Sequence, residues 1–182
     1  KFGIELPKTV AEALEIDRRT GTTFWKDAID KEMKNVRVAF DILPDGTRVP
    51  QDYQYAPLHM IFDVKMEDFR RKARLVAGGH VVKAPASITY ASVVSRETVR
   101  IALTAATINN VDVWAADVLN AYITAPCREK VWTTLGLEFG EDQGKKAIIV
   151  RALYGLKSSG AAFRAHLQGF MKEMGYKACK AD

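Results

Sequence analysis

The sequence lacks several features that mark common classes of protein. Its two cysteines, Cys127 and Cys179, stand at no metal-ligand or secreted-disulfide spacing, which predicts two unreactive thiols in a reducing compartment. No uncharged apolar run approaches the ~18 to 20 residues of a membrane-spanning helix, and the start of the chain has no secretory signal pattern. We therefore expect an intracellular protein, cytoplasmic or nuclear, that makes no contact with a membrane.

Common nucleotide-binding and catalytic motifs are also missing from the sequence. Neither glycine-rich nucleotide motif (G-x-G-x-x-G or G-x-x-x-x-G-K-[ST]) is present, and no two aspartates stand side by side. The three histidines, His59, His80 and His166, are scattered along the chain, so we assign them structural or surface positions. Any catalysis or ligand binding must therefore depend on groups other than glycine-rich loops, adjacent aspartates and histidines.

Positive charge is concentrated in one stretch. The 182 residues include 27 Lys and Arg against 22 Asp and Glu, a net charge of +5. Residues 68–83 hold several of these cations against one acid, Asp68. A basic stripe of this kind suits phosphate contacts, although an ordinary solvated surface has the same pattern. The cations are Arg70, Arg71, Lys72, Arg74 and Lys83.

Apolar spacing and turn signals predict an α+β protein. Residues 58–66 and 72–82 form a candidate β-hairpin, in which alternation places Lys72 and Arg74 on one face of the second strand. The double glycine Gly78–Gly79 either loosens the backbone or lets another chain approach closely. Helices are predicted over 9–14 with Thr9 as N-cap, over 23–36 with one apolar face, over 95–110 with Ser95 as N-cap, and over 158–177 with Gly175 at its end. Further strands are predicted over 38–42, 111–118, 130–135 and 145–153. In 95–110 the expected buried stripe is Val99, Ala102, Leu103 and Ala106.

Asp117 lies in the otherwise apolar run 113–119. An unpaired carboxylate in an apolar interior is very costly, so it must be neutralised, paired, solvated or bound to a cation. We expect Asp117 at the end of strand 111–118, where Mg²⁺ would suit it because this ion takes one or two carboxylates together with substrate phosphates. A role in capping the following turn explains the residue equally well.

Two further positions offer chemistry of their own. Tyr122 follows Asp117 closely and would stack beside the same pocket if the chain turns sharply, or lie half-buried in the core. Lys157, Ser158 and Ser159 open the last predicted helix, where backbone N–H groups suit an anion or a template strand. A plain connection between a strand and a helix would need the same residues.

Four segments in a fixed order carry a family resemblance. They read FDVKMEDFRRKARLVAGGH, TYASVVSRETVRIALTAA, VDVWAADVLNAYITAPCREKVWTTL and IIVRALYGLKSSGAAFRAHL. Together they closely resemble the reverse transcriptase domain of copia-type LTR retrotransposons, from about Pro7 to the end of the chain. The resemblance implies an incomplete polymerase right hand, an antiparallel sheet with packed helices. It also implies two regions, 1–110 with the N-terminal helices and fingers, and 111–182 with part of the palm.

The resemblance also implies roles for individual residues. Asp117 matches the first catalytic, metal-binding aspartate, which would use Mg²⁺ or Mn²⁺, and Tyr122 matches the aromatic steric gate. Lys72 and Arg74 match the strand that holds the incoming deoxynucleoside triphosphate, and Tyr154 and Gly155 match nucleotide contacts. Arg70, Arg71, Lys157 and Ser158 are the corresponding candidates for the RNA template and the DNA primer.

One departure from the family limits the expected activity. The second catalytic motif, Tyr-x-Asp-Asp, is not among the 182 residues. We expect a fragment of a retrotransposon polyprotein without thumb or ribonuclease H regions, inactive alone, whose parent is an RNA-directed DNA polymerase using two-metal nucleotidyl transfer. A decayed or domesticated nucleic-acid-binding remnant is the other interpretation. Without the missing hairpin, we expect exposed apolar surface near Asp117 and marginal stability.

Overall fold

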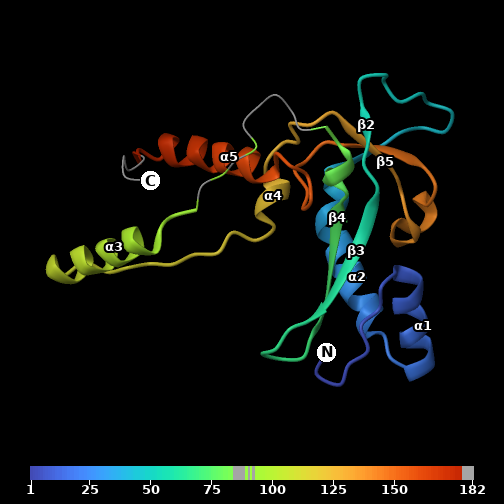
Figure 1. Cartoon of the computed structure of the whole chain (residues 1–182), viewed down its shortest axis with the longest axis horizontal. Coiled ribbons are helices and arrows are strands. Elements are labelled where there is room, and N and C mark those ends of the chain that lie inside the picture. The colour runs from blue at the N-terminus through green and yellow to red at the C-terminus, as the bar shows by residue number, and fades with distance from the viewer. Residues whose placement is uncertain (84–88, 90, 92, 178–182) are drawn as a thin grey trace.

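The computed structural model describes residues 1–83, 89, 91 and 93–177 (Figure 1). Cys179, predicted to be an unreactive thiol, lies outside these residues. Helices and strands of both pairing senses make up the described chain, so the α+β class predicted from the sequence is confirmed. No helix among the described residues is both long and apolar enough to cross a membrane.

Two helices open the chain, the first predicted from its cap at Thr9 and the second from its apolar spacing. α1 (Val10–Thr20) begins where the Thr9 hydroxyl accepts the Glu12 N–H at 3.1 Å, and it ends at Gly21 in the left-handed region. α2 (Phe24–Val36) begins against Asp17, whose carboxylate accepts the Lys26 N–H at 2.8 Å. The apolar face of α2 is buried as its spacing predicts, with Trp25, Ile29, Met33 and Val36 inside.

The predicted hairpin is confirmed. β3 (Leu58–Val64) pairs antiparallel with β4 (Arg71–Ala77), and α2 packs against β4. Alternate residues of β4 are buried, which leaves Lys72 and Arg74 on the less buried face, as predicted. β4 ends five residues before the predicted boundary, because the chain turns into the short helix η2 (Gly79–Val81).

A second sheet joins distant parts of the sequence. Its order is β1 (Phe40–Ile42), β6 (Lys146–Ile149), β5 (Val131–Thr134) and β2 (Gln54–Tyr55). β6 is antiparallel to both of its neighbours, and β2 is parallel to β5. The sheet takes two strands from each side of residue 110, so the two predicted regions share it. Between the strands lie the short helices η1 (Arg37–Ala39) and η3 (Leu137–Asp142).

The middle of the chain differs from the prediction. α3 (Arg96–Ile108) forms and is capped by Ser95, but the predicted buried stripe is wrong, because α3 contains no buried residue. The predicted strand 111–118 is also wrong, since these residues are extended without pairing and are all exposed, with Trp114 at 92%. Figure 1 shows α3 at the end of an arm, away from both sheets. An apolar face becomes buried only where another element covers it, and the described residues provide no such element here.

The last elements return to the body of the protein. The short α4 (Ala121–Thr124) packs on α5 (Ser159–Glu173) through a small cluster of Ala125, Ala152 and Ala162. Gly175, predicted to end the last helix, has φ +87° just beyond it. The main core lies between α1, α2 and the two sheets.

Candidate functional site

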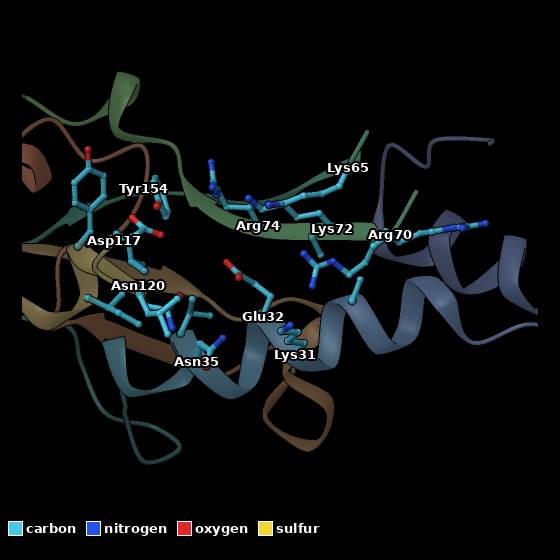
Figure 2. A pocket seen from close by; sticks show the side chains of 18 of the residues that line it. Lys31, Glu32, Asn35, Lys65, Arg70, Lys72, Arg74, Asp117, Asn120 and Tyr154 are labelled. Atoms are coloured by element: carbon cyan, nitrogen blue, oxygen red, sulfur yellow. The ribbon is translucent and has the colours of Figure 1, made fainter. Parts of the chain in front are cut away.

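A cavity of about 460 Å³ lies between β4, α2 and the segment that leads into α4 (Figure 2). Two carboxylates line it, those of Glu32 and Asp117. The cations on its lining outnumber the carboxylates, so positive charge is in excess. The six cations on its lining are Lys31, Lys65, Arg70, Arg71, Lys72 and Arg74.

Lys72 and Arg74 reach the cavity because β4 alternates. Their neighbours Ala73 and Leu75 point into the core, so these two cations share the opposite face. Partial burial lowers the pKa of the Lys72 ammonium, and repulsion from Arg74 and Lys65 lowers it further. Two like charges held close together on one strand favour an anionic ligand that would neutralise both.

Aromatic rings flank Arg74 on one side of the cavity. The Arg74 guanidinium lies 4.2 Å from the centre of the Tyr154 ring. Tyr154 packs in turn against Tyr122 at 4.8 Å between ring centroids, and Tyr122 contacts Phe163 of α5 at 6.2 Å. This row of rings limits the positions open to Arg74 through cation–π attraction. These contacts bring together three of the predicted site residues, Arg74, Tyr122 and Tyr154.

Asp117 lines the same cavity, but its surroundings differ from the prediction. The residue is exposed rather than buried at a strand end, so water solvates its carboxylate. The expected apolar environment is therefore wrong, whereas the predicted proximity to the basic hairpin is found. The chain turns at Asn120, which has φ +52°, and this turn leads into the helix that carries Tyr122.

Gly155 contacts the backbone of β4 rather than the cavity. It has φ +92°, and a Cβ at this position would lie 2.7 Å from Val76 Cγ1 and well inside contact distance of the Ala77 carbonyl oxygen. The Ala77 N–H donates to the Tyr154 carbonyl at 2.8 Å. Gly79 packs against Gly155 from the other side, so the close approach, one of the two alternatives for the double glycine, is found. Gly155 thus allows the loop that carries Tyr154 to dock on β4.

Lys157 and Ser158 lie outside the cavity lining. The Lys157 ammonium donates to the Val82 carbonyl at 2.6 Å. Ser158 is 1% exposed, and its N–H donates to the buried Glu129 carboxylate at 2.7 Å. A carboxylate of the protein therefore already occupies the start of α5, which the sequence suggested as an anion site. In this structure the Ser158 side chain presents no surface to a template strand.

Arg70 and Arg71 line the cavity at the turn end of the hairpin. Arg70 is exposed and lies 3.4 Å from the Asp68 carboxylate. Arg71 is half-buried, with its guanidinium 4.6 Å from the Phe24 ring centre and donating to the Phe69 carbonyl at 3.2 Å. Arg70 is consequently the more accessible of the two for a phosphate.

α2 contributes residues to the cavity that the sequence did not predict. Lys31, Glu32 and Asn35 line the cavity from this helix. Glu32 accepts the Leu75 N–H at 2.9 Å, and burial raises the pKa of its carboxyl above the usual range. Spacing alone gave no signal for these residues, because nothing in it indicates that α2 lies beside β4.

The described residues do not form a complete metal site. No group of three or more His, Cys, Asp or Glu side chains among them is placed to hold an ion. Asp117 can supply a single oxygen ligand of the kind that Mg²⁺ prefers, and the cavity's other carboxylate, Glu32, accepts a backbone N–H. A two-metal centre needs further carboxylates.

The thiol of Cys127 stays protonated at neutral pH, which makes it a poor nucleophile. Burial raises its pKa to about 11, and the Sγ–H donates to the Glu129 carbonyl. The thiolate is the nucleophilic form, so little of it exists at neutral pH.

Comparison with known proteins identifies the family of this chain. The family described as Reverse transcriptase (RNA-dependent DNA polymerase) matches residues 45–182. No curated protein and no solved structure matches the chain significantly. The match covers well over half of the sequence and includes β3, β4, Asp117 and the α5 region, so the chain belongs to the reverse transcriptase family.

Proposed function

We propose that this chain forms the fingers and the first part of the palm of a copia-type retrotransposon reverse transcriptase, and that its cavity holds the incoming deoxynucleoside triphosphate. The observation that carries the proposal is the convergence of Lys72 and Arg74 with Asp117, Tyr122 and Tyr154 in one cavity. These residues come from three separate stretches of the sequence, and the family match covers all of them.

The charges of the cavity suit a triphosphate. Lys72 and Arg74 would bind its phosphate oxygens by charge-assisted hydrogen bonds, which are stronger than neutral ones. Tyr122 and Tyr154 would pack against the sugar and the base. Binding of the anion would also relieve the repulsion between the two cations, which is one cause of the lowered Lys72 pKa.

Asp117 would be one ligand of Mg²⁺ or Mn²⁺ in the longer enzyme, where the ion would neutralise charge on the phosphates. The Tyr-x-Asp-Asp motif, which would supply further carboxylates of a two-metal centre, is absent from these 182 residues. We therefore expect binding without polymerisation from this chain. Template-dependent primer extension by the 182 residues alone would contradict that expectation.

Binding of Mg²⁺–dTTP to the purified chain, measured by calorimetry, tests the proposed function. Each charge-assisted contact is worth about 1.5–3 kcal/mol, so Lys72→Ala and Arg74→Ala should each weaken binding roughly tenfold or more. Lys26→Ala is the matched control, because Lys26 is an exposed cation on α2, outside the cavity. Equal affinity of all four proteins would refute the assignment of the cavity.

An RNA–DNA hybrid provides the second measurement. Arg70 and Arg71 would contact template or primer phosphates, and each such contact adds about 0.9 to the slope of log K against log salt. Arg70→Ala should reduce that slope by about one. Hybrid binding that depends on salt, without any binding of dTTP, would instead favour a nucleic-acid-binding remnant. A slope of zero would argue against both interpretations.

A further inference from the structure

Glu32 is a half-buried carboxylate in a cavity that would bind an anion. It lies on α2, which also contributes Lys31 and Asn35 to the cavity lining. Figure 2 shows its side chain pointing toward β4, the strand that carries Lys72 and Arg74. A negative charge at this place opposes the binding of a triphosphate. Its presence therefore needs a physical reason.

The first reason is that a backbone N–H on the outer edge of β4 needs a hydrogen-bond acceptor. β3 pairs with the other edge, so the outward N–H groups of β4 need separate acceptors. The Ala77 N–H finds the Tyr154 carbonyl at 2.8 Å, and the Leu75 N–H finds Glu32 Oε1 at 2.9 Å. Leu75 is fully buried, so water cannot replace this acceptor. Glu32 thus ties α2 to the strand at its midpoint.

The second reason is electrostatic. Lys72 and Arg74 lie on either side of Ala73 along β4, and their charges offset part of the cost of burying Glu32. The same attraction acts on the two cations and draws their side chains toward Glu32. Lys65 lines the cavity from the end of the hairpin, and Asp117 lines it from the segment before α4.

Resting on the proposed function, we propose that Glu32 is a positioning residue for triphosphate binding: its carboxylate fastens β4 to α2 and orients the Lys72 and Arg74 side chains over the cavity. It contacts no part of the ligand. The hydrogen bond fixes the strand, and the charge fixes the two cations that the strand carries.

Two substitutions separate these effects. Glu32→Ala removes both the acceptor and the charge. Glu32→Gln keeps an oxygen that can accept the Leu75 N–H but removes the charge. Asp30→Ala is the matched control, because Asp30 is an exposed carboxylate on the same helix, outside the cavity lining.

The experiment measures Mg²⁺–dTTP affinity against pH, together with hydrogen exchange at the Leu75 amide. Glu32→Ala should weaken binding about tenfold at neutral pH and speed exchange at Leu75. Glu32→Gln should restore slow exchange but only part of the affinity, because the charge that orients Lys72 and Arg74 is absent. Unaltered protein should bind more weakly as the pH falls through the raised pKa of Glu32, because protonation removes the charge that orients Lys72 and Arg74. The Gln variant should lack this component, whereas titration of the ligand's own phosphate is common to both.

The outcomes are distinguishable. No dTTP binding by the unaltered chain overturns the proposed function and the binding role of Glu32 with it. Normal binding by the unaltered chain together with equal affinity in the Ala variant overturns the positioning role alone. Identical pH profiles for the unaltered and Gln proteins also overturn it, because a purely structural carboxylate would leave the profile unchanged. If the Ala variant does not fold, the Gln profile decides.

Discussion

Replacement of Gly155 by alanine tests how the loop after β6 is attached to β4. The residue has φ +92°, where a side chain is strained, and a Cβ would overlap the Ala77 carbonyl oxygen. Strain of this kind costs about 1–2 kcal/mol. Relief of the overlap requires the loop to move, which breaks the bond from the Ala77 N–H to the Tyr154 carbonyl. A buried donor left without an acceptor costs about 1–3 kcal/mol.

The expected loss in the free energy of unfolding is therefore about 2–5 kcal/mol. Urea denaturation followed by tryptophan fluorescence measures it, because unfolding exposes the buried Trp25. Because Tyr154 would move, its contact with Arg74 would also be lost, and Mg²⁺–dTTP affinity should fall along with stability.

Two other glycines provide matched controls. Gly144 has φ +84° but no described atom near an added Cβ, so Gly144→Ala should show the backbone cost of about 1–2 kcal/mol alone. Gly169 lies inside α5 with open space around it, and Gly169→Ala should stabilise the protein by about 0.5–1 kcal/mol. If Gly155→Ala costs no more than Gly144→Ala, the docking of the loop on β4 is refuted.

Two further predictions concern Asp117 and Cys127. Asp117→Asn should change the free energy of unfolding by less than about 0.5 kcal/mol, because the carboxylate is exposed; a loss above about 2 kcal/mol in urea denaturation would show that it is buried and paired. In a Cys179→Ser background, Cys127 should react with iodoacetamide much more slowly in the native protein than in urea at pH 8, because burial raises its pKa to about 11. The native rate should rise as the pH approaches that value, and equal rates at pH 8 would contradict the burial of this thiol.

Local patterns in the sequence predicted several helices and strands of the structure. The Thr9 and Ser95 caps, the apolar face of α2 and the alternation of β4 depend on neighbours within one or two turns of the chain, and all four are found as predicted. The family was also readable from the sequence, because several motifs stand in a fixed order.

The segment from α3 to Asp117 shows the limit of such patterns. Its apolar spacing predicts burial in 95–110 and a strand in 111–118, yet α3 has no buried residue and Trp114 is 92% exposed. A strand needs a partner that supplies its hydrogen bonds, and a helix face needs another surface to cover it. Spacing reports that a segment can pack, whereas only the tertiary structure reports whether something packs on it.

The site itself divides in the same way. The sequence determined which groups bear charge and that Lys72 and Arg74 share a face, because alternation is a property of the strand alone. Tertiary structure decided that Asp117, Tyr122 and Tyr154 meet these cations in one cavity, that Glu129 closes the start of α5, and that α2 brings Glu32 to Leu75. The physical reason is that hydrogen bonds and charges act over a few ångströms in space, and only folding brings groups from distant parts of the sequence within that distance.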